Sequence, residues 1–78
     1  MDFTINGERV SLSDNDVRRA VRDLEPGVIH SHSVSVGGVD FPVKQVFAAA
    51  SGMDLLDFTT NQARRVLKRL GFELTRVA

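Results

Sequence analysis

The sequence predicts a small α+β domain in which two β-hairpins and a C-terminal strand pack with three helices, in the order ββαββααβ. Two turn signals, Asn6-Gly7 and Gly37-Gly38, each stand between short runs of alternating apolar and polar residues, which is typical of a hairpin. Three further segments repeat apolar residues at the spacing i, i+3, i+4, i+7, the pattern of a helix that packs on one face. The 78 residues are expected to form one domain, 1–78.

The first hairpin is predicted over residues 3–10. Asn6-Gly7 favours a type I′ turn, because both central positions of that turn need a positive φ. With this turn Ile5 pairs with Glu8, and one face of the hairpin becomes apolar. That face carries Phe3, Ile5, Val10 and Leu12.

A first helix is predicted over residues 13–25. Ser13 is a good N-cap, and Asp16 three residues later completes an acidic variant of the capping box. Pro26 and Gly27 are expected to end the helix. The apolar stripe consists of Val17, Ala20, Val21 and Leu24. The outward face carries Arg18, Arg19 and Arg22.

A second hairpin is predicted over residues 28–41, around Gly37-Gly38. The two-residue turn sets a register with one apolar face, made by Val34, Val36, Val39 and Phe41. The same alternation places His30 and His32 on that side of the hairpin. The opposite face, in contact with water, carries Ser31, Ser33, Ser35 and Asp40.

A second helix is predicted over residues 42–51. Pro42 suits its first position, where the fixed φ and the missing N–H are tolerated, and Gly52 is the expected left-handed residue after it. Its buried stripe is formed by Val43, Val46, Phe47 and Ala50. The link 53–57 contains Leu55 and Leu56, so we expect it to pack as a short turn.

A third helix is predicted over residues 59–70, with both ends defined by the sequence. Thr59 and Gln62 form a capping box, and Gly71 followed by Phe72 forms a Schellman ending, in which Phe72 contacts Leu67. The apolar face of this helix consists of Ala63, Val66, Leu67 and Leu70. A strand is expected over 72–77, with Phe72 and Leu74 facing inward.

The outward face of the third helix is basic and contains no acidic residue; it carries Arg64, Arg65, Lys68 and Arg69. Residues 1–60 hold nine acidic and five basic side chains, whereas residues 61–78 hold one acidic and five basic side chains. The first part therefore has a net charge of −4 and the second of +4, although the whole chain is neutral. Like charges at i, i+4 destabilise an isolated helix, and an anionic partner would relieve that repulsion.

Composition narrows the class of protein. No stretch is long or apolar enough to span a membrane, the first residues do not show the pattern of a signal peptide, and no cysteine occurs, so a cytoplasmic protein is expected. With no Trp or Tyr and only five Phe residues, a base-stacking surface of the kind used for RNA is disfavoured.

The order of helix 42–51, link, helix 59–70 and strand resembles a helix-turn-helix followed by a strand, as in winged-helix domains. In such domains the second helix enters the major groove of DNA. Asn and Gln can recognise adenine, Arg can recognise guanine, and Lys or Arg can contact phosphates. The expected contacts with double-stranded DNA are Thr60, Asn61, Gln62, Arg64, Arg65, Lys68 and Arg69. The link is longer than the usual turn of three or four residues. The capping box also uses the Gln62 side chain, which would then not be free to contact DNA.

Two stretches, 36–46 and 58–72, resemble a small uncharacterised module of actinobacterial type. Such modules occur as short stand-alone proteins and beside restriction-type nuclease domains, so the resemblance implies a nucleic-acid setting. The motifs that carry it are Phe41-Pro42-Val43-Lys44-Gln45, Ala63-Arg64-Arg65-Val66-Leu67 and Leu70-Gly71-Phe72.

Catalysis and metal binding have weaker support in the sequence. His30-Ser31-His32 offers two ligands on one strand face, whereas a zinc site needs three or four. The carboxylate pairs Asp14/Asp16 and Asp54/Asp57 stand at helix starts, where acids are expected for structural reasons. No nucleophile elbow or phosphate-binding loop is present. We therefore expect a protein that is not an enzyme and needs no cofactor and no metal.

A second functional class remains open. The separation of charge between the two parts of the chain also suits a protein–protein interaction module, including a homodimer or another self-associating form with no nucleic-acid role.

Overall fold

The computed structural model describes residues 1–76, and its elements follow the predicted order ββαββααβ. Val77, the predicted last residue of the final strand, lies outside the described residues. The strands are β1 (Asp2–Ile5), β2 (Glu8–Ser11), β3 (His32–Val36), β4 (Val39–Pro42) and β5 (Glu73–Arg76). The helices are α1 (Asp14–Ala20), α2 (Val43–Ser51) and α3 (Thr60–Arg69), with a short 3₁₀ helix, η1 (Leu55–Asp57), between α2 and α3.

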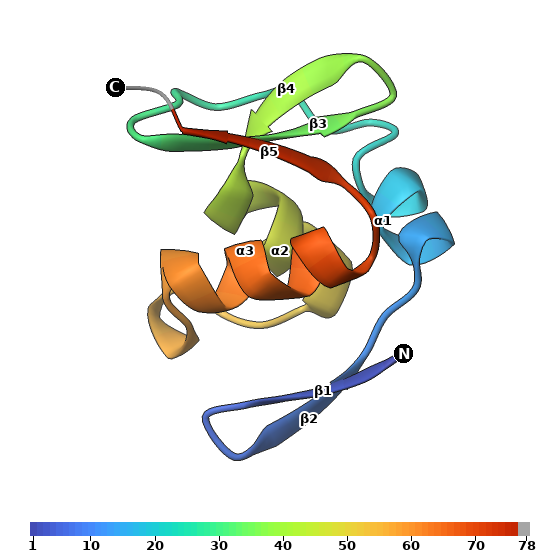
Figure 1. Ribbon diagram of the computed structural model, residues 1–78, viewed down its shortest axis with the longest axis vertical. Coiled ribbons are helices and arrows are strands. Elements are labelled where there is room, and N and C mark those ends of the chain that lie inside the picture. Colours follow the sequence, from blue (N-terminus) through green and yellow to red (C-terminus); the bar gives the residue numbers. More distant parts are fainter. Residues whose placement is uncertain (77–78) are drawn as a thin grey trace.

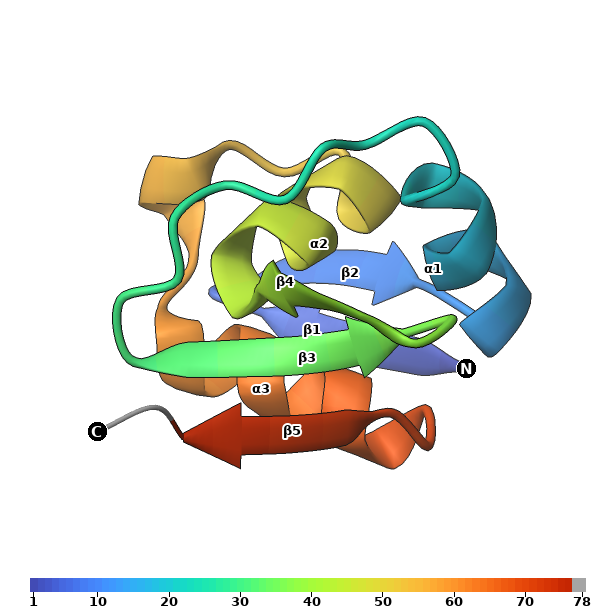
Figure 2. The ribbon, with the colours of Figure 1, turned by 90° about the horizontal axis from the view of Figure 1, so that it is seen from above.

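The elements form three layers (Figure 1). An antiparallel sheet of order β4-β3-β5 is the first layer, α2 and α3 are the second, and the β1–β2 hairpin is the third. Seen from the sheet side, α2 lies beneath β4 and α3 beneath β5, while α1 closes one end (Figure 2). Both faces of the helical layer are therefore covered, and α3 keeps only an outer side free.

Both hairpins have the predicted register. Ile5 pairs with Glu8 around a turn in which Asn6 and Gly7 have φ of 50° and 84°, as a type I′ turn requires. Val36 pairs with Val39 in the second hairpin. The last strand returns beside β3, so that Leu74 lies opposite Val34. Leu74 therefore faces the helical layer, as predicted.

The core lies between the two β layers and is centred on α2. Phe47 is fully buried, and its ring meets that of Phe58 in an edge-to-face contact with 4.7 Å between centroids. This contact joins α2 to the residue just before the cap of α3. Six other large side chains are less than 2% exposed: Leu67, Val17, Val34, Val43, Val46 and Val66.

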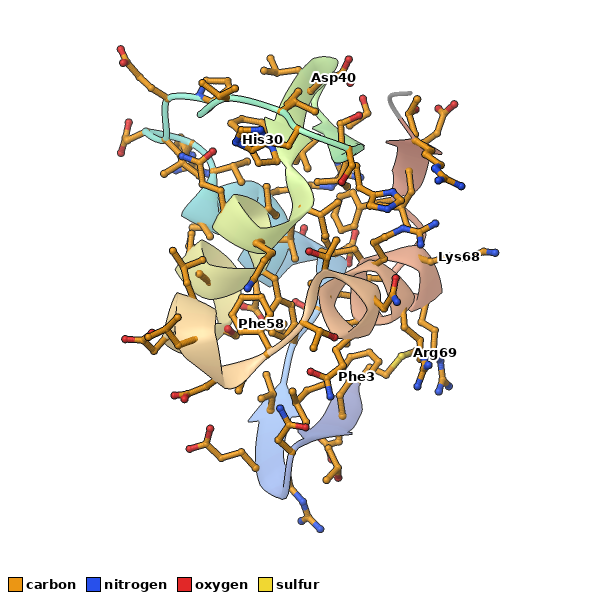
Figure 3. The ribbon with its side chains drawn as sticks, turned by 90° about the vertical axis from the view of Figure 1, so that its left-hand side faces the viewer. Phe3, His30, Asp40, Phe58, Lys68 and Arg69 are labelled. Carbon is orange, nitrogen blue, oxygen red and sulfur yellow. The ribbon has the colours of Figure 1, made fainter. Side chains whose placement is uncertain are left out.

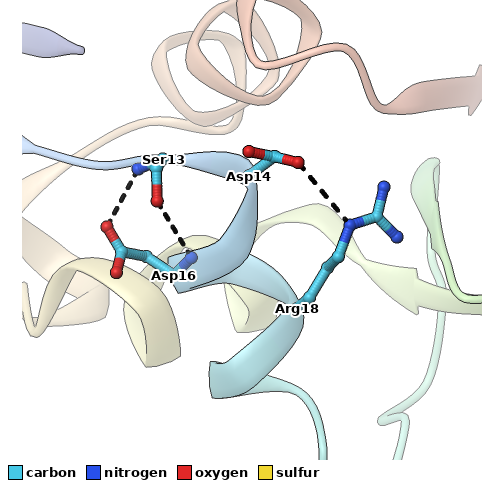
Figure 4. A network of polar contacts seen from close by, with 4 residues as sticks. All are labelled: Ser13, Asp14, Asp16 and Arg18. Carbon is cyan, nitrogen blue, oxygen red and sulfur yellow. Dashed lines mark hydrogen bonds and ion pairs between the residues drawn. The ribbon is translucent and has the colours of Figure 1, made fainter.

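The predicted start of α1 is confirmed, but its end is wrong. Ser13 accepts from the Asp16 N–H and donates its own N–H to the Asp16 carboxylate (Figure 4). The helix ends at Ala20 instead of continuing to residue 25. Gln45 of α2 explains the difference, because its side-chain amide binds the Glu25 carbonyl and the Gly27 N–H at 2.9 and 2.8 Å. These bonds hold residues 25–27 as a loop against α2.

The second hairpin is shorter than predicted. Its first strand begins at His32, not at residue 28, because β5 and β4 pair only with residues 32–36. His30 therefore lies in the exposed loop, separate from the strand face that carries His32. Ser33, predicted to face water, is only 3% exposed. It stands on the central strand between Pro42 and Thr75, and these neighbours cover it.

The link between α2 and α3 forms the predicted short turn, but its leucines do not pack. Leu55 is 50% exposed and Leu56 is 93% exposed. Met53 and Phe58, on either side of the turn, make the core contacts instead. Pro42 is also displaced by one position from the prediction, since it ends β4 and serves as the N-cap of α2.

Candidate nucleic-acid interface

The position of α3 is fixed at both of its ends by the bonds that the sequence predicts. Thr59 accepts from the Gln62 N–H at 3.1 Å, and Gln62 accepts from the Thr59 N–H at 2.8 Å. At the other end, the Phe72 N–H donates to the Leu67 carbonyl at 3.1 Å, as in a Schellman ending. Gly71 has a φ of 95°, which favours glycine at this position.

The outward side of α3 carries four cationic side chains, called here the basic face: Arg64, Arg65, Lys68 and Arg69. The opposite side is buried through Ala63, Val66 and Leu67. Figure 3 looks nearly along α3 and shows Lys68 pointing away from the body of the molecule, with Arg69 on the side of Phe3. Asp40 and His30 lie well away from them in the same view.

A shallow hollow of about 280 Å³ lies between α3 and β5 and is called here the basic hollow. Its lining residues are Asn61, Arg64, Arg65, Lys68 and Leu74. Leu74 supplies a half-buried apolar side chain, and three cations and an amide surround it. The hollow can therefore accept a group that is anionic at its edges, with or without an apolar centre.

Two further basic residues reach α3 from the sheet. The pairing of β3 with β5 places His32 opposite Arg76, on the same side of the sheet as Val34 and Leu74. Burial first, and then the charges of Arg64 and Arg76, lower the pKa of His32, so its imidazole is neutral at pH 7. Among residues 1–76, neither His32 Nδ1 nor Arg64 Nε, both buried, has a hydrogen-bond partner.

Two arginine side chains, one from α3 and one from α1, stack on phenylalanine rings. The Arg69 guanidinium lies over the ring of Phe3, 5.9 Å from its centroid, and that of Arg18 lies 5.2 Å from the centroid of Phe72. Arg18 also pairs with Asp14 at 3.8 Å (Figure 4). This exposed pair contributes little to stability, and it is the one ion pair within residues 1–76. No carboxylate of that part of the chain is paired with the basic face.

The structure brings together five of the predicted contact residues and separates two. Asn61 and the basic face share the outer side of α3. There the Asn61 side-chain oxygen accepts from the Arg64 guanidinium at 3.5 Å. The side chain of Gln62 is occupied by the cap and by Asn6, whose amide it contacts at 2.9 and 3.4 Å. Thr60 lies one turn before Arg64, but it lines a different hollow, with Val28, His30 and His32.

The sequence prediction did not include Arg76 or His32 in this site. A signal for Arg76 exists, because alternation from Leu74 places it on the inward face of its strand. Nothing local reveals that β5 pairs with β3 in a register that sets Arg76 beside His32 and Arg64. That proximity comes from residues more than forty positions apart.

Other kinds of site have little support in the described residues. Across residues 1–76 there is no group of three or more His, Cys, Asp or Glu side chains placed to hold one metal ion. None of the helices there is long and apolar enough to cross a membrane.

The chain was also compared with known proteins. A family model described as SCO5918-like matches residues 3–78. This match fits the actinobacterial-type module that the second half of the chain resembles, and it extends to the first hairpin and α1 as well. No curated protein and no solved structure matches the chain.

Proposed function

The chain belongs to the SCO5918-like family, and we propose that it is a small non-enzymatic protein that binds double-stranded DNA through α3. The observation that carries this proposal is the set of five cations on one side of the molecule without a paired carboxylate among residues 1–76. They are Arg64, Arg65, Lys68 and Arg69 on α3 and Arg76 on β5. Phosphates of a duplex would neutralise these charges and release counterions.

Phosphate contacts fall to the exposed members of this set. Arg65, Lys68 and Arg69 on α3 and Arg76 on β5 are exposed, and Figure 3 shows Lys68 pointing outward. Arg64 is half-buried, and its Nε is enclosed, so it supports the hollow from below and adds charge to it. Such contacts position a protein on DNA but carry no sequence information.

Base recognition, in this proposal, rests on Asn61. Its exposed side chain lies in the first turn of α3, the part of a recognition helix that meets base edges, and an amide can bind adenine through two hydrogen bonds. Gln62 serves the cap and the contact with Asn6 instead. The finer form of the proposal is a winged-helix-like docking in which residues 52–58, including η1, form a longer link than the usual turn of three or four residues.

The test is a fluorescence-anisotropy titration of a labelled duplex at low salt. The variant carrying Arg65→Ala and Lys68→Ala should bind about tenfold or more weakly, because two charge-assisted phosphate contacts are lost. The matched control carries Arg9→Ala and Arg22→Ala, which removes the same charge from exposed positions on β2 and after α1. This control should bind almost as well as the natural chain.

Two outcomes would contradict the proposal. One is an absence of binding at low salt, where phosphate contacts are strongest. The other is an equal loss of affinity in both double variants, which would show that net charge matters and the position of α3 does not.

A second prediction separates the roles of two neighbouring amides. Gln62→Ala should lower the free energy of unfolding by about 1–2 kcal/mol, because it removes one side of the capping box and the bonds to Asn6. Duplex affinity of the folded protein should stay the same. Asn61→Ala should do the reverse, with little change in stability and weaker binding to a duplex that contains its adenine. Urea denaturation and anisotropy measure the two effects, and a swap of these results would assign base recognition to Gln62.

A further inference from the structure

The turn between α2 and α3 exposes two neighbouring leucine side chains to water. This segment, called here the leucine turn, consists of Asp54, Leu55, Leu56 and Asp57. Leu56 is 93% exposed and Leu55 is 50% exposed. Burying a leucine side chain is worth about 1.5–3 kcal/mol, and the turn forgoes most of that gain.

The backbone of the leucine turn is nevertheless held firmly. The Asp54 carboxylate accepts from the Leu56 N–H at 2.9 Å. The Leu55 carbonyl accepts from the Lys44 ammonium at 2.7 Å, and that ammonium lies 5.0 Å from the centroid of Phe58. The Asp57 carbonyl accepts from the Asn6 side chain at 2.8 Å. The two leucines are therefore presented on a rigid support, which lowers the entropy cost of docking them into a partner.

Acidic groups border the exposed leucines. Asp54 and Asp57 flank them in the chain, and Glu8 lines the same hollow as Leu56, between the first hairpin and the turn. Two cations stand nearby. Lys44 is engaged by the Leu55 carbonyl and Phe58, and Arg9 lines the adjoining hollow with Asp54. The leucine turn thus presents an apolar tip between carboxylates.

The basic hollow has the complementary chemistry. It offers the half-buried Leu74 surrounded by Arg64, Arg65 and Lys68. In Figure 3 the leucine turn, in faint light orange, lies to the left of α3, whereas Lys68 and Arg69 of the basic face lie to its right. A chain therefore cannot fill its own hollow with its own turn.

We propose that the leucine turn of one copy docks into the basic hollow of a second copy. Leu56 would meet Leu74, and Asp54 and Asp57 would meet the surrounding cations. The contact is head-to-tail, since it joins two different surfaces, so each copy keeps one free turn and one free hollow. Repetition of this contact gives a ring or an open chain. It does not depend on DNA binding, although a duplex bound to the basic face would compete with it.

Sedimentation analysis of the DNA-free protein over a wide concentration range tests this contact. For the natural chain, the weight-average mass should rise with concentration above the chain mass of 8.6 kDa. Leu56→Lys alters the turn, and Arg65→Glu with Lys68→Glu alters the hollow. Each variant should remain at 8.6 kDa. Because Leu56 contacts water, Leu56→Lys should keep the fold, which circular dichroism checks.

The decisive sample is an equimolar mixture of the two variants. The Leu56→Lys chain keeps an intact hollow and the other variant keeps an intact turn, so exactly one contact can form. The mixture should reach twice 8.6 kDa and no more. Val28→Lys is the matched control, since it makes the same change at another exposed apolar side chain, which is 76% exposed. It should associate like the natural chain.

Several results would overturn the proposal: a natural chain whose mass does not change with concentration, a Val28→Lys chain that also fails to associate, or a mixture that stays monomeric. Association of the Arg65→Glu, Lys68→Glu chain on its own would also overturn it, and would point instead to a symmetric contact between two leucine turns. The Leu56→Lys monomer should still bind duplex DNA, so failure of this contact and failure of the proposed function give different results.

Discussion

Raising the monovalent salt concentration from about 50 to 200 mM should weaken duplex binding by roughly 150-fold if the four exposed cations contact phosphates, since each contact adds about 0.9 to the magnitude of the slope of log K against log salt. Arg65, Lys68 and Arg69 of this set lie on α3, and Arg76 lies on β5. Without a paired carboxylate among residues 1–76, no internal ion pair has to break before a phosphate binds. The full slope would be about −3.6.

Anisotropy titrations at a series of salt concentrations measure this slope. The variant with Arg65→Ala and Lys68→Ala should have a slope of about −1.8, because two of the four contacts are missing. The control with Arg9→Ala and Arg22→Ala should keep the slope of the natural chain. A slope close to zero for the natural chain would contradict phosphate binding by the basic face, whatever the affinity at low salt.

Phe47→Ala should lower the free energy of unfolding by about 3–5 kcal/mol. Phe47 is fully buried in α2, and its ring contacts Phe58, so the truncation leaves a cavity at the centre of the core. A domain of this size has a total stability of about 4–12 kcal/mol. At moderate temperature, a large fraction of the variant should therefore be unfolded.

Urea denaturation followed by circular dichroism measures the change. Phe3→Ala is the control, because it removes the same atoms from a half-buried site at the edge of the first hairpin, and it should cost clearly less. A loss below about 1 kcal/mol for Phe47→Ala would mean that the core relaxes around the missing ring. Because the contact with Phe58 precedes the cap of α3, folded Phe47→Ala protein should also hold α3 less precisely.

Features that depend on neighbouring residues were predictable from the sequence. The type I′ turn at Asn6-Gly7, the capping boxes at Ser13 and Thr59 and the Schellman ending at Gly71 all involve groups within a few positions of each other. The structure confirms each of them. The basic face was predictable for the same reason. Once the start of a helix is known, its period determines which side chains lie on the same face.

Features that depend on distant residues were not predictable. α1 ends at Ala20 because Gln45 binds the loop after it, and Ser33 is buried because β5 arrives beside it. Leu55 and Leu56 face water because Met53 and Phe58 occupy the core positions near them. In each example, the local pattern suits the predicted structure, and a residue elsewhere in the chain decides otherwise.

The candidate site shows the same division. The sequence by itself determined that α3 has fixed ends, a buried apolar stripe and an outer face of four cations, because caps and periodicity act over a few residues. Only the tertiary structure decided that Asn6 occupies the Gln62 side chain, that Arg76 and His32 stand beside Arg64, and that Leu56 remains exposed. Those outcomes depend on which strands pair and which surfaces are covered, and these are settled by packing between segments far apart in the chain.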